Sequence, residues 1–106
     1  MIRSVQPLLP ELKAGLAAIY GDRLSGVYLF GSYARGEEDR ESDVDVLVLL
    51  DEIRHYAEEV DRTGALGSRL SLKYGVSISQ VFMRESDWRR GETPFLANVR
   101  EEAVTV

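Results

Sequence analysis

Three apolar runs, each bounded by polar or turn-forming residues, predict the strands of this chain. They span residues 24–30, 43–50 and 76–83. Runs of this length that are rich in Val, Leu, Ile and Phe are typical of buried strands. In the second run the residues after Asp45 are apolar at successive positions, so both faces should be covered. The sequence therefore predicts that this strand is central in a sheet.

Apolar residues at helical spacing predict two long helices. The first should span residues 7–20 and end at Gly21, and the second should span residues 52–74, with Asp51 as its cap. Between the first two strands, residues 32–35 should form one helical turn that Ser32 caps.

The C-terminal part of the chain predicts shorter elements. Ser86 should cap a turn over residues 87–90, and Thr93 should cap a helix over residues 94–101, followed by an optional edge strand over residues 103–106. The order is then α-β-α-β-α-β-α with an optional final strand. This order predicts an α/β (α+β) fold with a mixed three- to four-stranded sheet and helices packed on it. We expect residues 1–106 to form a single domain.

Composition narrows the classes of function. The chain of 106 residues has no cysteine and one histidine, so disulfide frameworks and cysteine- or histidine-based metal sites are excluded. Its net charge of −5 argues against a surface that binds duplex nucleic acid. No apolar run approaches the ~20 residues of a membrane span. The N-terminal residues lack a signal-peptide pattern, and we expect a cytoplasmic protein.

Two polar features at the predicted strand ends carry candidate chemistry. Asp43 and Asp45 are two residues apart at the start of a strand, so their carboxylates should lie on one face and repel each other unless a cation lies between them. Oxygen ligands of this kind suit Mg²⁺. Gly31 and Ser32, at the end of the preceding strand, offer close backbone approach, a hydroxyl and free N–H groups for phosphate. By itself an Asp-x-Asp pair is more often turn chemistry than a metal site.

Together these features resemble a family signature. The chain is similar to the minimal nucleotidyltransferases, the small members of the DNA polymerase beta-like nucleotidyltransferase superfamily, through Gly31-Ser32-x-Ala34-Arg35-Gly36 and, five residues later, Ser42-Asp43-x-Asp45. The resemblance covers residues 31–48, and the length and the order of elements also fit that family.

The resemblance implies a role for each of these residues. Asp43 and Asp45 would be the catalytic and metal-binding residues of a two-metal Mg²⁺ site, and Gly31, Ser32 and Arg35 would bind the nucleotide, ATP or another NTP. For Arg35 a structural salt bridge to a nearby acidic residue, among residues 37–39, is an equal alternative.

The family also implies a partner. Many minimal nucleotidyltransferases act as antitoxins of a HEPN-domain toxin, some by adenylylating it. Two interpretations stay open: an enzyme that transfers a nucleoside monophosphate to a hydroxyl of such a partner, or a catalytically weakened nucleotide-binding antitoxin that neutralises its partner by binding. The analogy also leaves a homodimer open.

One departure from the family bears on that choice. Active members carry a third carboxylate on the next strand, but residues 76–83 contain no Asp or Glu. We align Ser77 with the missing carboxylate, although Ser79 should face the same way. Serine is a weak ligand for Mg²⁺ and cannot act as the base for the acceptor hydroxyl. Glu85 and Asp87, just past this strand, are alternative sources of a carboxylate.

Aromatic residues and the histidine complete the candidates. Tyr33 and Trp88 could stack on a nucleobase, with Tyr33 the better candidate because it lies inside the motif and Trp88 more suited to packing. His55 should be a surface residue rather than a base.

Overall fold

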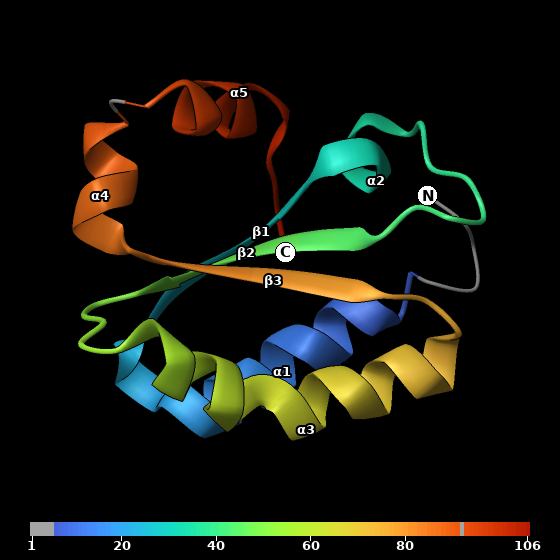
Figure 1. The fold of residues 1–106 in the computed structure, drawn as a ribbon, viewed down its shortest axis with the longest axis horizontal. Coiled ribbons are helices and arrows are strands. Elements are labelled where there is room, and N and C mark those ends of the chain that lie inside the picture. The colour runs from blue at the N-terminus through green and yellow to red at the C-terminus, as the bar shows by residue number, and fades with distance from the viewer. Residues whose placement is uncertain (1–5, 92) are drawn as a thin grey trace.

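The computed structural model describes residues 6–91 and 93–106, which form a four-stranded mixed sheet with helices on both faces (Figure 1). The strands are β1 (Leu24–Phe30), β2 (Val44–Leu50), β3 (Ile78–Arg84) and β4 (Val104–Thr105). Their order is β3-β2-β1-β4, with β1 antiparallel to both of its neighbours and β2 parallel to β3. The predicted mixed sheet is confirmed, including the short edge strand at the C-terminal end.

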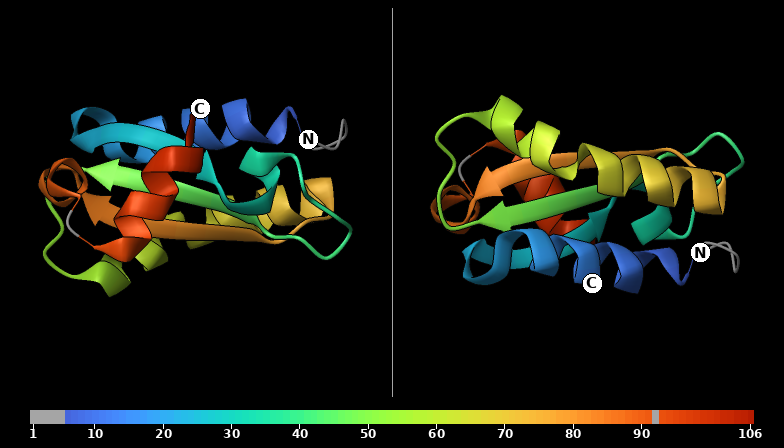
Figure 2. Two further views of the ribbon diagram at one scale, coloured as in Figure 1. Left: turned by 90° about the horizontal axis from the view of Figure 1, so that it is seen from above. Right: turned by 90° about the horizontal axis from the view of Figure 1, so that it is seen from below.

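The helices divide between the two faces of the sheet. One face is covered by two long helices that lie side by side, α1 (Leu8–Tyr20) and α3 (Tyr56–Tyr74) (Figure 2). The other face carries three shorter helices, α2 (Gly31–Arg35), α4 (Glu85–Arg90) and α5 (Pro94–Glu102) (Figure 1). A short 3₁₀ helix, η2 (Gly21–Arg23), joins α1 to β1.

The alternation of side chains along β2 explains this two-sided arrangement. Val44, Val46, Val48 and Leu50 are buried in the core beneath α1 and α3, whereas Leu47 and Leu49 are buried with Val99 of α5 on the opposite face. Both faces of β2 are therefore covered, as its apolar run predicts. Asp45 shares the face of Leu47, so its carboxyl group lies on the α5 side of the sheet.

The helix α3 and the strand β3 both begin later than predicted. The helix α3 begins at Tyr56, not at residue 52, because Asp51 is used elsewhere: its Oδ1 accepts from Glu52 N–H at 2.7 Å and lies 3.4 Å from Arg23 Nε. Strand β3 begins at Ile78, because Val76 N–H closes the end of α3 by donating to the Ser71 carbonyl at 3.2 Å.

The two predicted C-terminal caps have different outcomes. Ser86 is not a cap, since α4 begins at Glu85 and Ser86 lies inside it. Thr93 does cap α5, because its Oγ1 accepts from Leu96 N–H at 3.2 Å and Pro94 follows in the first turn. The start of α5 is therefore defined by a local hydrogen bond within its own first turn.

A buried carboxylate links α3 to α1 and η2. Glu59 of α3 is 2% exposed, and it accepts a hydrogen bond from Tyr20 Oη at 3.0 Å. Arg23 Nη2 lies 3.0 Å from its other oxygen, and Arg62 Nε lies 3.2 Å from the first. Burial, together with Glu59, raises the pKa of the Tyr20 hydroxyl. Every oxygen of this buried group is paired, which is the condition for such a group to be tolerated.

Replacement of Glu59 by glutamine should lower the free energy of unfolding by about 2 kcal/mol, because it removes charge-assisted hydrogen bonds from a buried position. The matched control is Glu58→Gln, one residue away, whose carboxylate is exposed and whose ion pair to Arg62 is long at 3.8 Å. That control should cost about 0.5 kcal/mol or less. Urea unfolding measures both, and equal losses would contradict the assignment.

Candidate active site

The two halves of the sequence motif meet where β1 ends and β2 begins. Because these strands are antiparallel, Phe30 at the end of β1 pairs with Asp45 near the start of β2. The next residue after Phe30, Gly31, opens the short helix α2. Backbone from the Gly-Ser turn and side chains from the Asp-x-Asp pair are thus brought to one edge of the sheet.

Gly31 is in direct contact with Asp45. A Cβ atom placed on Gly31 would collide with Asp45 Oδ2, because it would come closer than 3.0 Å, a separation that real Cβ atoms do not show. The φ angle of Gly31 is +76°, a conformation that residues with a side chain rarely adopt. Both the backbone conformation and the close approach therefore require glycine at this position.

The two aspartates form one patch of negative charge. Asp43 is exposed and directly precedes β2, which begins at Val44, one residue later than predicted, and Asp45 is half-buried. Burial raises the pKa of the Asp45 carboxyl, and the nearby charges of Asp43 and Glu102 raise it further, while Arg35 opposes them. The site thus holds more negative charge than Arg35 neutralises.

Ser32 and Ser42 lie on either side of this patch in the sequence and have different surroundings. Ser32 lies inside the first turn of α2, where Phe30 is the N-cap, so the prediction that Ser32 caps the turn is wrong. Ser42 Oγ accepts from Asp39 N–H at 2.9 Å and lies 3.3 Å from Asp39 Oδ1, so it stabilises the loop that leads to Asp43.

Arg35 is held by two carboxylates. Its Nε lies 3.0 Å from Glu37, which confirms the salt bridge to a nearby acidic residue. Its Nη1 lies 2.8 Å from Oε2 of Glu102, in the last turn of α5. The guanidinium therefore lies between α2 and α5, beside the motif.

Sequence reasoning missed Glu102, which also accepts a hydrogen bond from Gly31 N–H to Oε1 at 3.0 Å. Arg35 and the Gly31 N–H hold the pKa of Glu102 below its usual range, so the group is a carboxylate at neutral pH. One signal was present in the sequence. Glu101 and Glu102 end a helix, where the helix dipole disfavours negative charge, so a nearby cation is favoured there.

The register of β3 identifies the residue beside Asp45. Asp45 pairs with Ser79, whereas Ser77 lies one alternation earlier and its carbonyl accepts from Val44 N–H at 2.8 Å. In parallel neighbours the paired side chains point to the same face, so Ser79 lies beside Asp45, while Ser77, which we aligned with the missing carboxylate, lies one alternation earlier, towards Asp43.

Glu85 and Asp87 do not supply the missing carboxylate. They follow β3, so they lie at the far end of a strand that runs parallel to β2, about 17 Å of strand from Ser79. Both are engaged there: Glu85 with Arg89, and Asp87 with Arg84 and Arg90.

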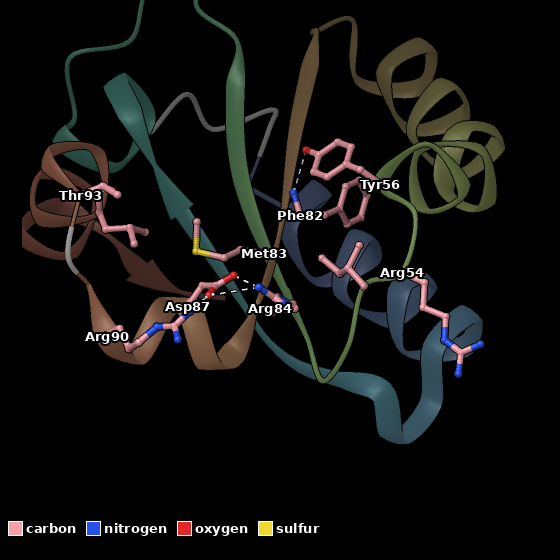
Figure 3. Close-up of a pocket in the computed structure, with 10 residues that line it drawn as sticks. Arg54, Tyr56, Phe82, Met83, Arg84, Asp87, Arg90 and Thr93 are labelled. Carbon is pink, nitrogen blue, oxygen red and sulfur yellow. Dashed lines mark hydrogen bonds and ion pairs between the residues drawn. The ribbon is translucent and has the colours of Figure 1, made fainter.

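A hollow of about 680 Å³ lies at that far end and not at the motif. Figure 3 shows Tyr56, Phe82 and Met83 on its walls and the ion pair of Arg84 with Asp87 at its rim. A second hollow of about 510 Å³ includes Asp43 and Ser77. We assign the candidate site to the Asp43 end because the chemistry, rather than the volume, converges there.

The aromatic candidates for base stacking are used for packing. Tyr33 is 4% exposed and belongs to the core beneath α1 and α3, so the prediction that it is the better stacking residue is wrong. Trp88 packs against Tyr28 with ring centroids 5.2 Å apart, and the Arg100 guanidinium lies 5.0 Å from its ring. His55 is exposed at the start of α3, as expected.

The aspartate pair fits Mg²⁺ only in part. Among the described residues no group of three or more His, Cys, Asp or Glu side chains could hold a metal ion. Mg²⁺, however, is usually bound by one or two carboxylates together with water and substrate phosphates. The raised pKa of Asp45 reports charge that such a cation would neutralise. The pair thus fits an ion that arrives with other oxygen ligands.

A helix able to cross a membrane is not found among the residues that the structure describes.

Replacement of Asp45 by asparagine should raise the thermal unfolding temperature of the metal-free protein at neutral pH. A raised carboxyl pKa means that ionised Asp45 destabilises the fold; this cost grows as the pH rises through the raised pKa and vanishes below the unfolded value. The gain in unfolding temperature of the variant over wild type should therefore shrink towards about pH 4. At neutral pH, added Mg²⁺ should reduce this difference, because the ion stabilises only the wild type. Calorimetry tests this, and a variant less stable than wild type at neutral pH would contradict it.

Gly31→Ala should destabilise the protein more than Gly36→Ala. Both glycines have a positive φ angle, +76° and +72°, but a Cβ on Gly36 would meet nothing within 4 Å. Gly36→Ala should cost about 1–2 kcal/mol for the backbone alone. The additional loss in Gly31→Ala then measures the collision with Asp45. Denaturant unfolding gives both values, and equal losses would show that the approach of Gly31 to Asp45 is looser than described.

Comparison with known proteins identifies the family of this chain. The family model of the nucleotidyltransferase domain matches residues 9–103. A protein of Methanocaldococcus jannaschii named "Putative protein adenylyltransferase MJ0141" is 38% identical over 99 residues, covering 93% of this chain and 95% of that protein.

Solved structures share the fold. A structure described as "putative minimal nucleotidyltransferase" matches with a TM-score of 0.60 at 28% identity, covering 96% of this chain and 95% of that one. A toxin–antitoxin structure with AMP-PNP matches with a TM-score of 0.66 at 22% identity, covering 91% and 69%. The complex of a tri-AMPylated Shewanella oneidensis HEPN toxin with an MNT antitoxin matches with a TM-score of 0.50 at 18% identity, covering 92% and 70%. The chain therefore belongs to the nucleotidyltransferase domain family.

Proposed function

We propose that this protein is a Mg²⁺-dependent nucleotidyltransferase that transfers AMP from ATP to a hydroxyl group of a partner protein of the HEPN toxin class. The observation that carries the proposal is the contact between Gly31 and Asp45, because it brings a glycine backbone suited to phosphate against a carboxylate suited to a metal. The adenylyltransferase name of the archaeal relative and the MNT–HEPN complex support the reaction and the class of partner.

In this reaction the acceptor hydroxyl oxygen attacks the α-phosphorus of ATP, the bond from that phosphorus to the β-phosphate oxygen breaks, and pyrophosphate leaves with the electron pair. The hydroxyl proton is lost to solvent or to a base. Gly31 N–H and Ser32 would hold the β- and γ-phosphates, and Arg35 would offset their charge. Mg²⁺, when bound, would neutralise phosphate charge and polarise the reacting oxygens. Asp43 and Asp45 would hold that ion and orient the phosphates against the acceptor.

A second candidate function is a nucleotide-binding antitoxin that has lost most of its catalytic power and neutralises its partner by contact. A specific observation favours it: the residue in register with Asp45 on β3 is Ser79, and the whole of β3 lacks a carboxylate. Without a carboxylate there, the acceptor hydroxyl lacks a base on that strand. Binding of ATP with Mg²⁺ should then persist while transfer is slow.

The test is incubation of the protein with labelled ATP, Mg²⁺ and a HEPN-domain protein, with calorimetry of nucleotide binding alongside. Asp45→Asn should reduce transfer about a hundredfold or more, because the charge that holds the metal is lost. Absence of nucleotide binding would refute both candidate functions. Binding without any transfer would select the antitoxin that acts by contact.

Ser79→Asp should raise transfer about tenfold or more by restoring a carboxylate beside Asp45. Ser77→Asp is the matched control, since the same charge is added one alternation earlier, and it should have the smaller effect. A larger gain from Ser77→Asp would mean that the sequence alignment, rather than the strand register, identifies the missing ligand. No gain from either variant would mean that another group already serves as base.

A further inference from the structure

We propose that Glu102 is an internal competitor of the nucleotide: its carboxylate occupies the Gly31–Arg35 donor pair, by which we mean the N–H of Gly31 and the guanidinium of Arg35. Oε1 accepts from Gly31 N–H at 3.0 Å, and Oε2 accepts from Arg35 Nη1 at 2.8 Å. The contacts join α5 to α2, which lie beside each other on one face of the sheet (Figure 2). The inference rests on the proposed function, which assigns the same two donors to phosphate.

A carboxylate can take the place of a phosphate here because the two anions offer similar acceptors. Each presents two oxygens on one anionic group, and a guanidinium binds either of them through charge-assisted hydrogen bonds. Glu102 uses both of its oxygens on the donor pair, so a triphosphate cannot reach these donors until the side chain leaves.

The position of the Glu102 carboxylate carries an electrostatic cost as well as a gain. Its carboxylate adds to the negative charge around Asp45, and it lies in the last turn of a helix, where negative charge is disfavoured. The ion pair with the Arg35 guanidinium offsets both costs, so the carboxylate stays on the donor pair until another anion competes for it. A role as metal ligand is not supported, since the described carboxylates form no group of three able to hold an ion.

The Gly31–Arg35 donor pair becomes free if the Glu102 side chain alone rotates away. The backbone on either side of Glu102 is fixed: Ala103 N–H donates to the Val99 carbonyl at 2.8 Å, Val104 pairs with Leu29, and Val106 N–H donates to the Val27 carbonyl at 3.0 Å. The Glu102 side chain itself is 21% exposed, so it borders solvent into which it can move. α5 and β4 can therefore stay in place while a triphosphate replaces the carboxylate.

Such competition has a defined thermodynamic effect. The apparent dissociation constant of a ligand rises by the inverse of the fraction of molecules in which its site is free. If Glu102 covers the donors in about nine molecules of ten, the affinity for triphosphate is reduced about tenfold. Removing the negative charge at this position should restore that affinity.

The experiment is calorimetric titration of the full chain with ATP and Mg²⁺, and separately with inorganic tripolyphosphate. Glu102→Gln keeps the shape of the side chain and removes its charge, and it should bind both probes about tenfold more tightly than wild type. Glu101→Gln, the exposed neighbour, removes the same charge from the same helix turn and should stay within about twofold. Thermal unfolding of each variant verifies that it is folded.

A folded Glu102→Gln variant that binds the probes no better than wild type would overturn the inference while leaving the proposed function intact. If neither wild type nor the variant binds ATP, the proposed function fails and the inference fails with it. NMR spectroscopy provides a second test of the competition between Glu102 and phosphate. Tripolyphosphate added to wild type should shift the Gly31 amide and the Glu102 side-chain carboxyl resonances together, and binding that leaves them unmoved would also overturn the inference.

Discussion

The structure around the motif depends on one electrostatic constraint, the charge of Asp45 at the head of a strand that is buried on both faces. The Asp45 carboxyl is half-buried and close to Asp43, and its pKa is raised as a result. On one side Gly31 packs directly against it, so no side chain can lie there to shield the charge. An aspartate kept in such a place favours a cation that comes from outside the chain.

The neighbouring elements are arranged around that charge. The antiparallel pairing of β1 with β2 brings Gly31 to Asp45, and α2 then carries Arg35 to the same edge of the sheet. Helix α5 crosses this face and places Glu102 on the two donors that an anion would use. In the resting protein Glu102 pairs with Arg35 and with the Gly31 N–H, and a nucleotide with Mg²⁺ would exchange these two contacts for its own.

Much of this arrangement could be predicted from the sequence, because the relevant signals are local. Apolar runs identified the strands, and the double-sided burial of β2 followed from the residues after Asp45. The spacing of Asp43 and Asp45 predicted one shared face, which the alternation along β2 supports. The salt bridge of Arg35 to Glu37 is also a contact between neighbours in the sequence.

The features that could not be predicted depend on contacts between distant segments. Glu102 reaches Gly31 across 71 residues, and no local pattern specifies that contact. The choice between Ser77 and Ser79 depends on the register of two parallel strands, which a one-dimensional alignment does not determine. Tyr33 has an aromatic ring that could stack on a base, but in α2 this ring packs into the core. Asp51 was expected to cap α3, but its carboxylate forms an ion pair with Arg23 instead.

The central claim is that the Gly-Ser turn and the two aspartates form one nucleotide site. The most direct test is a crystal structure of the protein with Mg²⁺ and a non-hydrolysable ATP analogue. The account predicts phosphate oxygens on Gly31 N–H and near Arg35, with Mg²⁺ between the phosphates and the carboxylates of Asp43 and Asp45. A triphosphate bound elsewhere, such as in the hollow beside Arg84, with the Gly-Ser turn unchanged, would contradict it.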